Sequence, residues 1–217
     1  MNSTMLEILV LAGIAIFLVL RLRGVLGTRE GFEKPPAQAP HAQAGSEFDV
    51  IEGGPDRDIT DHVPENSESA GALAGMKREE PSFTVGEFLS GARGAYEMIL
   101  MGFERGEIES LRPFLSDDVF ETFEEVVNQR KQQGLTIKAE FVGVRELNLL
   151  DASFDPNTRR ADLTIAYVAE LTSAVYDASG ELVEGDARKV MTQKDSWTYT
   201  RIMGSDDPNW QLTATDT

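Results

Sequence analysis

The chain carries one continuous apolar run near its start, over residues 5–20, followed directly by Arg21 and Arg23. A membrane-spanning helix needs about 20 mostly apolar residues, so this run is at the short end of that range. Glu7 near one end and the two arginines at the other can reach the lipid headgroups, which makes them the expected flanks of a span. The sequence therefore predicts a single membrane anchor over residues 1–29.

Two other interpretations of the apolar run remain, a cleaved signal peptide and a buried core helix. A signal peptide would have basic residues before the run and a small-residue cleavage site after it, and this chain has neither. Because positive charge follows the run and does not precede it, the short N-terminus is expected outside and the rest of the chain in the cytoplasm.

Residues 30–82 are rich in Pro, Gly, Ala, Ser and acidic residues and contain few large apolar ones. Such a composition buries too little apolar surface to offset the entropy of ordering the chain. We expect an acidic, disordered tether here. Phe48, Val50 and Ile51 form a small apolar island within it, which is either a chance feature of a linker or a short docking motif.

Residues 83–217 have the apolar patterning of one globular domain. Thr84 and Glu87 form a capping box, and the apolar residues that follow recur at helical spacing. A long first helix is expected here, and two further helices over residues 108–115 and 116–134.

The apolar pattern then changes to a period of two, which is typical of half-buried strands. We expect four strands, at residues 135–150, 161–171, 189–203 and 210–215. A long connection, residues 176–186, joins the second strand to the third. Helices followed by consecutive antiparallel strands predict an α+β domain with about three helices packed on a curved four-stranded sheet.

The domain lacks the residue types that catalysis most often uses. The chain has no cysteine, and its two histidines, His41 and His62, both fall in the expected tether. Nucleophilic triads, imidazole–metal sites and thiol chemistry are therefore excluded from the domain. We expect no catalytic residue, no cofactor and no metal. An enzyme that uses only carboxylates and tyrosine is the remaining catalytic alternative.

The charge of the domain disfavours nucleic acid as a partner. The whole chain has a formal charge of −17, and from Phe83 onward there are 13 basic against 24 acidic residues, a net −11. A negative field of this size repels phosphate backbones and anionic headgroups.

One face of the third strand carries Asp195, Trp197, Tyr199 and Arg201. Either the two aromatic residues fill the core with Asp195 and Arg201 paired at its rim, or the four residues line a pocket for a ligand or peptide. The candidate pocket or partner surface comprises Tyr96, Leu100, Phe103, Tyr167, Asp195, Trp197, Tyr199 and Arg201.

Several long segments resemble a known family. They are FLSGARGAYEMILMGFERGEIESLRPFLSDDVFETFEEVVNQRKQQG, FVGVRELNLLDASF, VEGDARKVMTQKDSWTYTR and DPNWQLTAT. These segments resemble the alphaproteobacterial TimA group of Tim44-like domain proteins. The group is related to the subunit that tethers the chaperone motor to the protein translocase of the mitochondrial inner membrane.

The resemblance implies a cystatin-like roll of the nuclear-transport-factor-two-like kind and a non-enzymatic adaptor or scaffold at the bacterial inner membrane. Its partners would be proteins, such as a chaperone or translocation and assembly machinery. The alternative is a sensor that binds a small ligand or lipid between the sheet and the helices. Oligomeric state and the identity of the partner remain open.

Overall fold

The computed structural model describes residues 56–216, in which the helices precede the strands. The helices are α2 (Arg57–Thr60), α3 (Glu68–Glu79), α4 (Val85–Arg105), the short 3-10 helix η1 (Ile108–Phe114) and α5 (Asp117–Gln132). The expected anchor over residues 1–29 and the apolar island at Phe48, Val50 and Ile51 lie outside the described residues. Within residues 56–216, no helix combines the length and apolarity that crossing a membrane requires.

The helix boundaries follow the predicted capping signals. The Thr84 side chain accepts a hydrogen bond from the Glu87 N–H, as the capping box requires, and α4 ends at Gly106 with φ of 72°. Ser116 caps α5 in the same way. Pro113 lies inside η1, which is a 3-10 helix and not an α-helix.

The four strands are antiparallel neighbours in sequence order, which confirms an α+β fold. They are β1 (Thr136–Asp155), β2 (Arg160–Tyr176), β3 (Leu182–Ile202) and β4 (Gln211–Asp216). β3 begins seven residues before the predicted start at Lys189, so the predicted long connection after β2 is short. The early part of β3 is exposed on both faces, and its sequence therefore shows no alternation.

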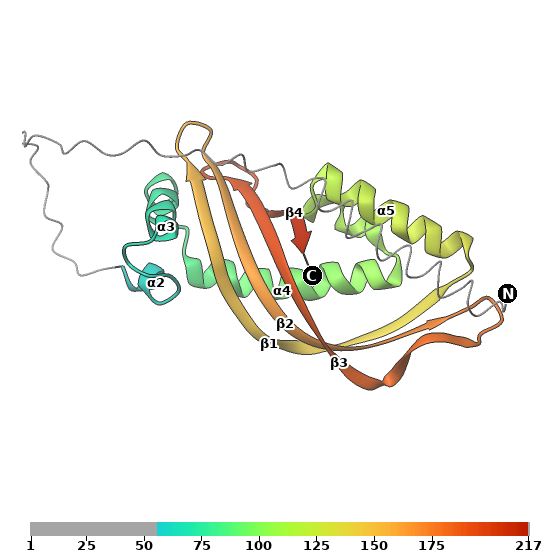
Figure 1. Ribbon diagram of the computed structural model, residues 1–217. Coiled ribbons are helices and arrows are strands. Elements are labelled where there is room, and N and C mark those ends of the chain that lie inside the picture. Colours follow the sequence, from blue (N-terminus) through green and yellow to red (C-terminus); the bar gives the residue numbers. More distant parts are fainter. Residues whose placement is uncertain (1–55, 217) are drawn as a thin grey trace, which may run out of the picture. The chain divides into compact units, whose positions relative to one another are not determined.

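The sheet curves strongly, and α4 and α5 lie inside the curve (Figure 1). Residues that pair across β1, β2 and β3 form rows on the inner face, such as Leu149, Ile165 and Trp197. Leu163, Ile165 and Tyr199 are at most 1% exposed. The core therefore lies between this inner face and α4.

The expected disorder of residues 30–82 is wrong for residues 56–82. Leu73 and Met76 of α3 are fully buried, and α3 packs against β1. A Cβ on Gly75 would lie 2.7 Å from the Phe154 ring, so only glycine allows this approach. Because α3 is rich in small residues and packs this closely, it needs few large apolar side chains to be held in place. The prediction of disorder, which was based on composition alone, is therefore wrong for this helix.

Asp58 of α2 ties the N-terminal helices to α4. Its carboxylate accepts hydrogen bonds from the Val85 N–H at 2.8 Å and the Gly86 N–H at 3.0 Å, and it pairs with Lys77 of α3 at 2.7 Å. Burial raises the pKa of Asp58, but the hydrogen bonds from Lys77, Gly86 and Val85 outweigh it and lower the pKa below its ordinary value. A negative charge is thereby held at the start of α4, where the helix dipole favours it.

The sheet has two parts that differ in cover. We call residues 147–154, 161–167 and 195–201 the covered end, because β3 turns one face into the core there. We call residues 136–144, 169–176 and 182–193 the open arm. β3 alternates between buried and half-buried residues in the covered end and is almost wholly exposed in the open arm, whereas β2 has buried residues in both.

Candidate partner-binding surface

Six of the eight predicted site residues come together, but in the core and not around a cavity. Tyr96 is fully buried, and Tyr167, Tyr199 and Trp197 are 1%, 1% and 4% exposed. Tyr96 stacks on Tyr167 with ring centroids 4.2 Å apart, and Trp197 lies 4.6 Å from Tyr96. Leu100 and Asp195 are buried with them. These rings fill the space between α4 and the sheet.

Phe103 and Arg201 lie apart from this cluster. Phe103 packs on Phe123 of α5 with centroids 4.4 Å apart, and the Arg130 guanidinium lies 4.4 Å above its ring. Arg201 pairs with Glu80, so the expected pair between Asp195 and Arg201 is wrong. The two residues are six positions apart on one strand, about 20 Å along it, which is beyond side-chain reach.

Asp195 is the polar centre of the buried cluster. Its Oδ2 accepts hydrogen bonds from the Tyr96 hydroxyl and, at 2.8 Å, from the Gln193 amide, whereas its Oδ1 is buried with no hydrogen-bond partner among the described residues. Burial raises the pKa of Asp195, and the bonds from Tyr96 and Gln193 offset this only in part.

The tyrosine hydroxyls bond to one another and to the backbone. The Tyr167 and Tyr199 hydroxyl oxygens are 3.0 Å apart, and Tyr167 donates to the Ala92 carbonyl at 3.3 Å. Burial raises the pKa of both tyrosines well above the ordinary range, so both stay protonated at neutral pH. A closed set of neutral hydroxyls stabilises the core and offers no nucleophile to solvent.

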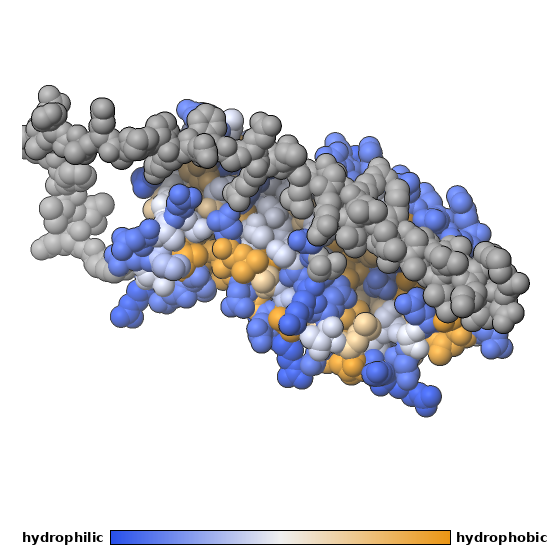
Figure 2. Space-filling view, viewed as in Figure 1, coloured by the Kyte–Doolittle hydropathy of each residue, from blue (hydrophilic) through white to orange (hydrophobic). Residues whose placement is uncertain are grey.

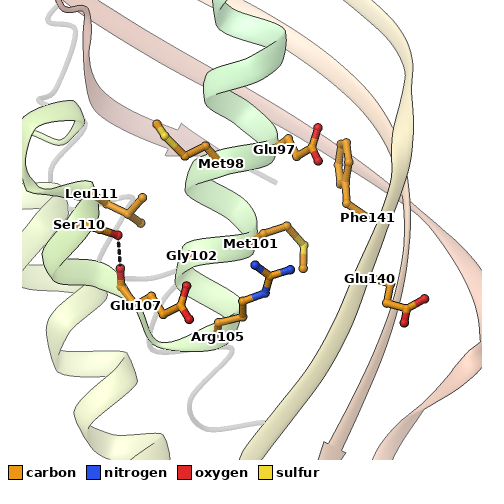
Figure 3. Close-up of a pocket in the computed structure, with 10 residues that line it drawn as sticks. All are labelled: Glu97, Met98, Met101, Gly102, Arg105, Glu107, Ser110, Leu111, Glu140 and Phe141. Carbon is orange, nitrogen blue, oxygen red and sulfur yellow. Dashed lines mark hydrogen bonds between the residues drawn. The ribbon is translucent and has the colours of Figure 1, made fainter.

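A groove runs along the outer face of the second half of α4 and has a volume of about 530 Å³. Met98, Met101 and Gly102 of α4 lie along it, with Leu111 of η1 on one side and Phe141 of β1 on the other (Figure 3). We call it the α4 groove. A Cβ on Gly102 would lie 3.0 Å from the Leu111 methyl groups, so glycine lets η1 approach closely and form that side.

The rim of the α4 groove is mostly acidic. Glu97, Glu107 and Glu140 line it, with Arg105 as the one basic lining residue. All three glutamates are exposed, and none forms an ion pair with another described residue. Within residues 56–216, no group of three acidic or histidine side chains is arranged to hold a metal ion.

A second hollow of about 350 Å³ lies at the start of α4 and has five aromatic side chains in its lining, Phe83, Phe88, Phe114, Tyr199 and Trp210. Phe88 and Trp210 meet edge to face with centroids 4.7 Å apart. Of the predicted site residues, only Tyr199 and Arg201 line this hollow. Figure 2 shows that the visible surface is largely hydrophilic, with separate hydrophobic patches.

The sequence analysis missed the α4 groove. One signal was present, because Met98 lies outside the apolar stripe that α4 turns toward the sheet and is 39% exposed. The acidic rim had no such signal, because its three glutamates come from α4, the turn after it and β1.

Comparison with known proteins agrees with the quoted segments. Residues 69–217 match the model of the Tim44-like domain. The chain belongs to the Tim44-like domain family. The match begins inside α3, so the Tim44-like domain includes most of this helix and not only residues from 83 onward.

The search of curated proteins gave no match to this Tim44-like chain. Among solved structures, the crystal structure of the intermembrane space region of the chloroplast protein ARC6 is similar, with 14% sequence identity and a TM-score of 0.41. The similarity covers 59% of this chain and 94% of that one.

Proposed function

We propose that this Tim44-like protein is a membrane-anchored, non-enzymatic adaptor whose domain binds other proteins at the membrane. One observation carries the proposal: the polar groups of the predicted pocket are closed inside the core, whereas apolar and charged side chains together line an open groove on α4. A groove that combines apolar and charged side chains is typical of a non-obligate protein-binding surface.

The proposed anchor, subgroup, topology and fold type rest on the sequence. The anchor comprises residues 1–29 with Glu7, Arg21 and Arg23 as its flanks, and residues 30–55 link it to the domain. The protein belongs to the TimA subgroup and crosses the bacterial inner membrane once, with the domain in the cytoplasm. The domain is a roll of the nuclear-transport-factor-two-like kind.

The adaptor role is tested by crosslinking in cells followed by affinity purification. The full-length chain is compared with a form that lacks residues 1–29. We expect both to recover the same proteins, and the anchored form to recover more of them. Recovery of nothing above an untagged control would overturn the proposal.

The topology is tested separately with single cysteines, because the natural chain has none. Ser3→Cys and Ser179→Cys mark the two sides of the expected anchor. A membrane-impermeant maleimide added to spheroplasts should label the first and spare the second, and lysis should expose both. Labelling of Ser179→Cys in intact spheroplasts would reverse the proposed orientation.

The second candidate is a small-ligand or lipid sensor, and the aromatic hollow at the start of α4 is the observation that favours it. A ligand at 100 times its dissociation constant adds about 2.7 kcal/mol of stability. Melting of the protein with and without membrane lipid extract measures this gain. A clear rise in melting temperature, absent in Trp210→Ala, would favour the sensor over the adaptor.

A further inference from the structure

We infer that two copies of this chain pair through the open arm of β3, with the two strands antiparallel. The inference goes beyond the proposed adaptor role and does not depend on it. Three observations carry it: a free edge of the sheet, a concentration of exposed apolar side chains along that edge, and a charge pattern that complements itself when the strand is reversed.

The edge of the sheet is free along the open arm of β3. In the sheet, β3 lies between β2 and β4, but β4 pairs only with residues 196–200. Among the described residues 56–216, residues 182–195 therefore have no strand on their second side (Figure 1). A free sheet edge favours association with another chain unless side chains prevent it.

Exposed apolar side chains are concentrated on this edge. Eight large apolar side chains are exposed within residues 56–216, and half of them lie between residues 182 and 191 of β3. These four are each at least 36% exposed, and they are Leu182, Val183, Val190 and Met191. One apolar pair stands at each end of this ten-residue segment, so its apolar pattern is the same when it is read in either direction.

The charged residues of the same edge form two blocks of opposite sign. Three exposed acidic residues come first and three exposed basic residues follow, with no opposite charge inside either block: Glu181, Glu184 and Asp186, then Arg188, Lys189 and Lys194. An antiparallel second copy brings each acidic block against a basic block, whereas a parallel copy brings like charges together and is repelled.

The charge of the rest of the domain confines the pairing to this strand. Residues 56–216 hold 16 basic and 31 acidic residues, so two copies repel one another over most of their surface. The open arm of β3 is where basic residues are gathered next to exposed apolar ones. A second copy therefore gains most by placing its own acidic block there.

The two patterns together select one register, with a two-fold axis between Asp186 and Ala187. Apolar residues then face apolar residues and the acidic block faces the basic block. The facing pairs are Leu182 with Met191, Val183 with Val190, and Glu184 with Lys189. Each pair occurs twice, because a two-fold interface uses the same surface on both subunits.

A bulge in β3 determines the kind of contact. Gly185 has φ of 78°, residues 187–190 have no partner on β2, and the Arg188 N–H donates to the Asp186 carboxylate at 2.9 Å. The edge is not evenly extended there, so the contact consists of side chains more than of a continuous ladder of backbone hydrogen bonds. The same irregularity disfavours the addition of an arbitrary strand, whereas a copy with matching side chains still fits.

The register is tested with cysteines in the full-length chain in detergent, because the natural chain has none. Leu182→Cys and Met191→Cys are made in two differently tagged chains, which are mixed and oxidised. A disulfide needs Cα atoms within about 7 Å. We expect the mixed disulfide, and almost none from Leu182→Cys alone, because two copies of that position lie nine positions apart. No mixed disulfide, or an equal yield from Leu182→Cys alone, would overturn the inference.

The charge pattern is tested by sedimentation equilibrium of the same full-length protein in density-matched detergent. Glu184→Lys turns two attractive pairs of each dimer into repulsive ones and should raise the dimer Kd about 30-fold, and Lys189→Glu should do the same. Glu146→Lys on β1 is the matched control, because it is also exposed and changes the net charge by the same amount. The control should not weaken the dimer, since it lowers the general repulsion between copies.

A mixture of the two reversed chains separates contact between copies from other causes. Each reversed charge then faces its opposite on the other chain, so the mixture should dimerise nearly as well as the natural protein. A mixture as weak as either variant alone would overturn the inference, as would a natural chain that is monomeric at about 100 µM. Dimers that form equally well with either reversal would place the contact elsewhere and would also overturn it. All three positions are exposed, so the variants should melt like the natural chain.

Discussion

β3 belongs to two regions of the sheet with different surroundings. In the covered end, Trp197 and Tyr199 are 4% and 1% exposed beneath α4. In the open arm, Val190 and Met191 of the same strand are 49% and 48% exposed. The backbone pairs with β2 in both regions, but residues 187–190 have no partner on β2, and only residues 196–200 of the covered end also pair with β4.

The difference teaches that the covered end supplies the stability of the domain, while the open arm and the α4 groove leave apolar surface available. Burial of apolar side chains is the main stabilising contribution in folding, and it is concentrated in the covered end. In the open arm, β2 still buries Ala169, Leu171 and Ala174, and the exposed apolar side chains lie on β3. Two pairs of variants test this division directly, and two further pairs test contacts within and beside the two regions.

The largest effect is expected from core truncation. Ile165→Ala in the covered end removes a fully buried side chain and should lower the free energy of unfolding by about 3 kcal/mol. Met191→Ala in the open arm should cost less than about 1 kcal/mol. Urea unfolding followed by tryptophan fluorescence measures both, because both tryptophans lie in the domain. Similar losses would remove the distinction between the regions.

Glycines in the open arm and in the turn that joins β2 to β3 give the next effect. Gly180 and Gly185 have φ of 84° and 78°, so alanine is strained at both positions. Only at Gly185 would the new Cβ also lie 2.2 Å from the Ser173 carbonyl oxygen, whereas Gly180 is open. We expect Gly185→Ala to cost about 2 kcal/mol more than Gly180→Ala. An equal cost would mean that β3 can move away from the Ser173 carbonyl oxygen at Gly185 with little loss of stability.

The coupling energies of two ion pairs should differ by less than the two glycine variants do. Arg201 and Glu80 are 10% and 18% exposed and 3.0 Å apart, and a double-mutant cycle with glutamine at each position should give a coupling of about 1.5 kcal/mol. Glu170 of the open arm pairs at 2.8 Å with Arg145, but Arg145 is 66% exposed. The same cycle there should give no measurable coupling.

Two aspartates should give opposite and smaller effects of pH. The pKa of Asp58 is lowered, so its stabilisation is present above the ordinary value of 3.8 and is lost as the pH falls through the lowered value. The pKa of Asp195 is raised, so stability is lost as the pH rises from 3.8 through the raised value.

The measurement is the free energy of unfolding between pH 3 and pH 7. Asp58→Asn should flatten the acid side of the profile, and Asp195→Asn should flatten the fall toward neutral pH. Ser205→Ala, at a half-buried position without a titrating group, is the control. If Asp195→Asn instead steepens the fall of the free energy of unfolding with pH, the hydrogen bonds to the Asp195 carboxylate outweigh the cost of its burial.

Much of the fold could be predicted because its signals are local. Thr84 and Ser116 mark the starts of α4 and α5, and the alternation after Arg160 marks β2. Each of these patterns spans only a few residues. The same reasoning placed the aromatic residues of β2 and β3 on one face, and they do share a face.

The errors arise where the deciding partner is distant in sequence. Glu80 pairs with Arg201, 121 residues away, and nothing near Glu80 indicates this. Ser69 of α3 donates to Asp151 of β1 at 2.9 Å across 82 residues. The helix that carries Ser69 was therefore mistaken for part of a tether.

The candidate site was predicted less well than the fold. A strand face with aromatic and charged residues is compatible with a filled core or with an open pocket, and only packing decides between them. Here Tyr96 from α4 fills the space above Tyr167 and Trp197. The groove on the other face of α4 depends on η1 and β1, whose positions the sequence of α4 does not contain.

The sequence by itself determined the helix starts, the strand alternation, the Tim44-like family and the absence of cysteine and histidine chemistry from residues 83–217. These follow from local backbone preferences and from composition. Only the tertiary structure decided that the aromatic cluster is core, that α3 belongs to the domain and that α4 has an open groove. The physical reason is that burial depends on which distant surfaces meet, and side chains compete for the same space only after the chain has folded.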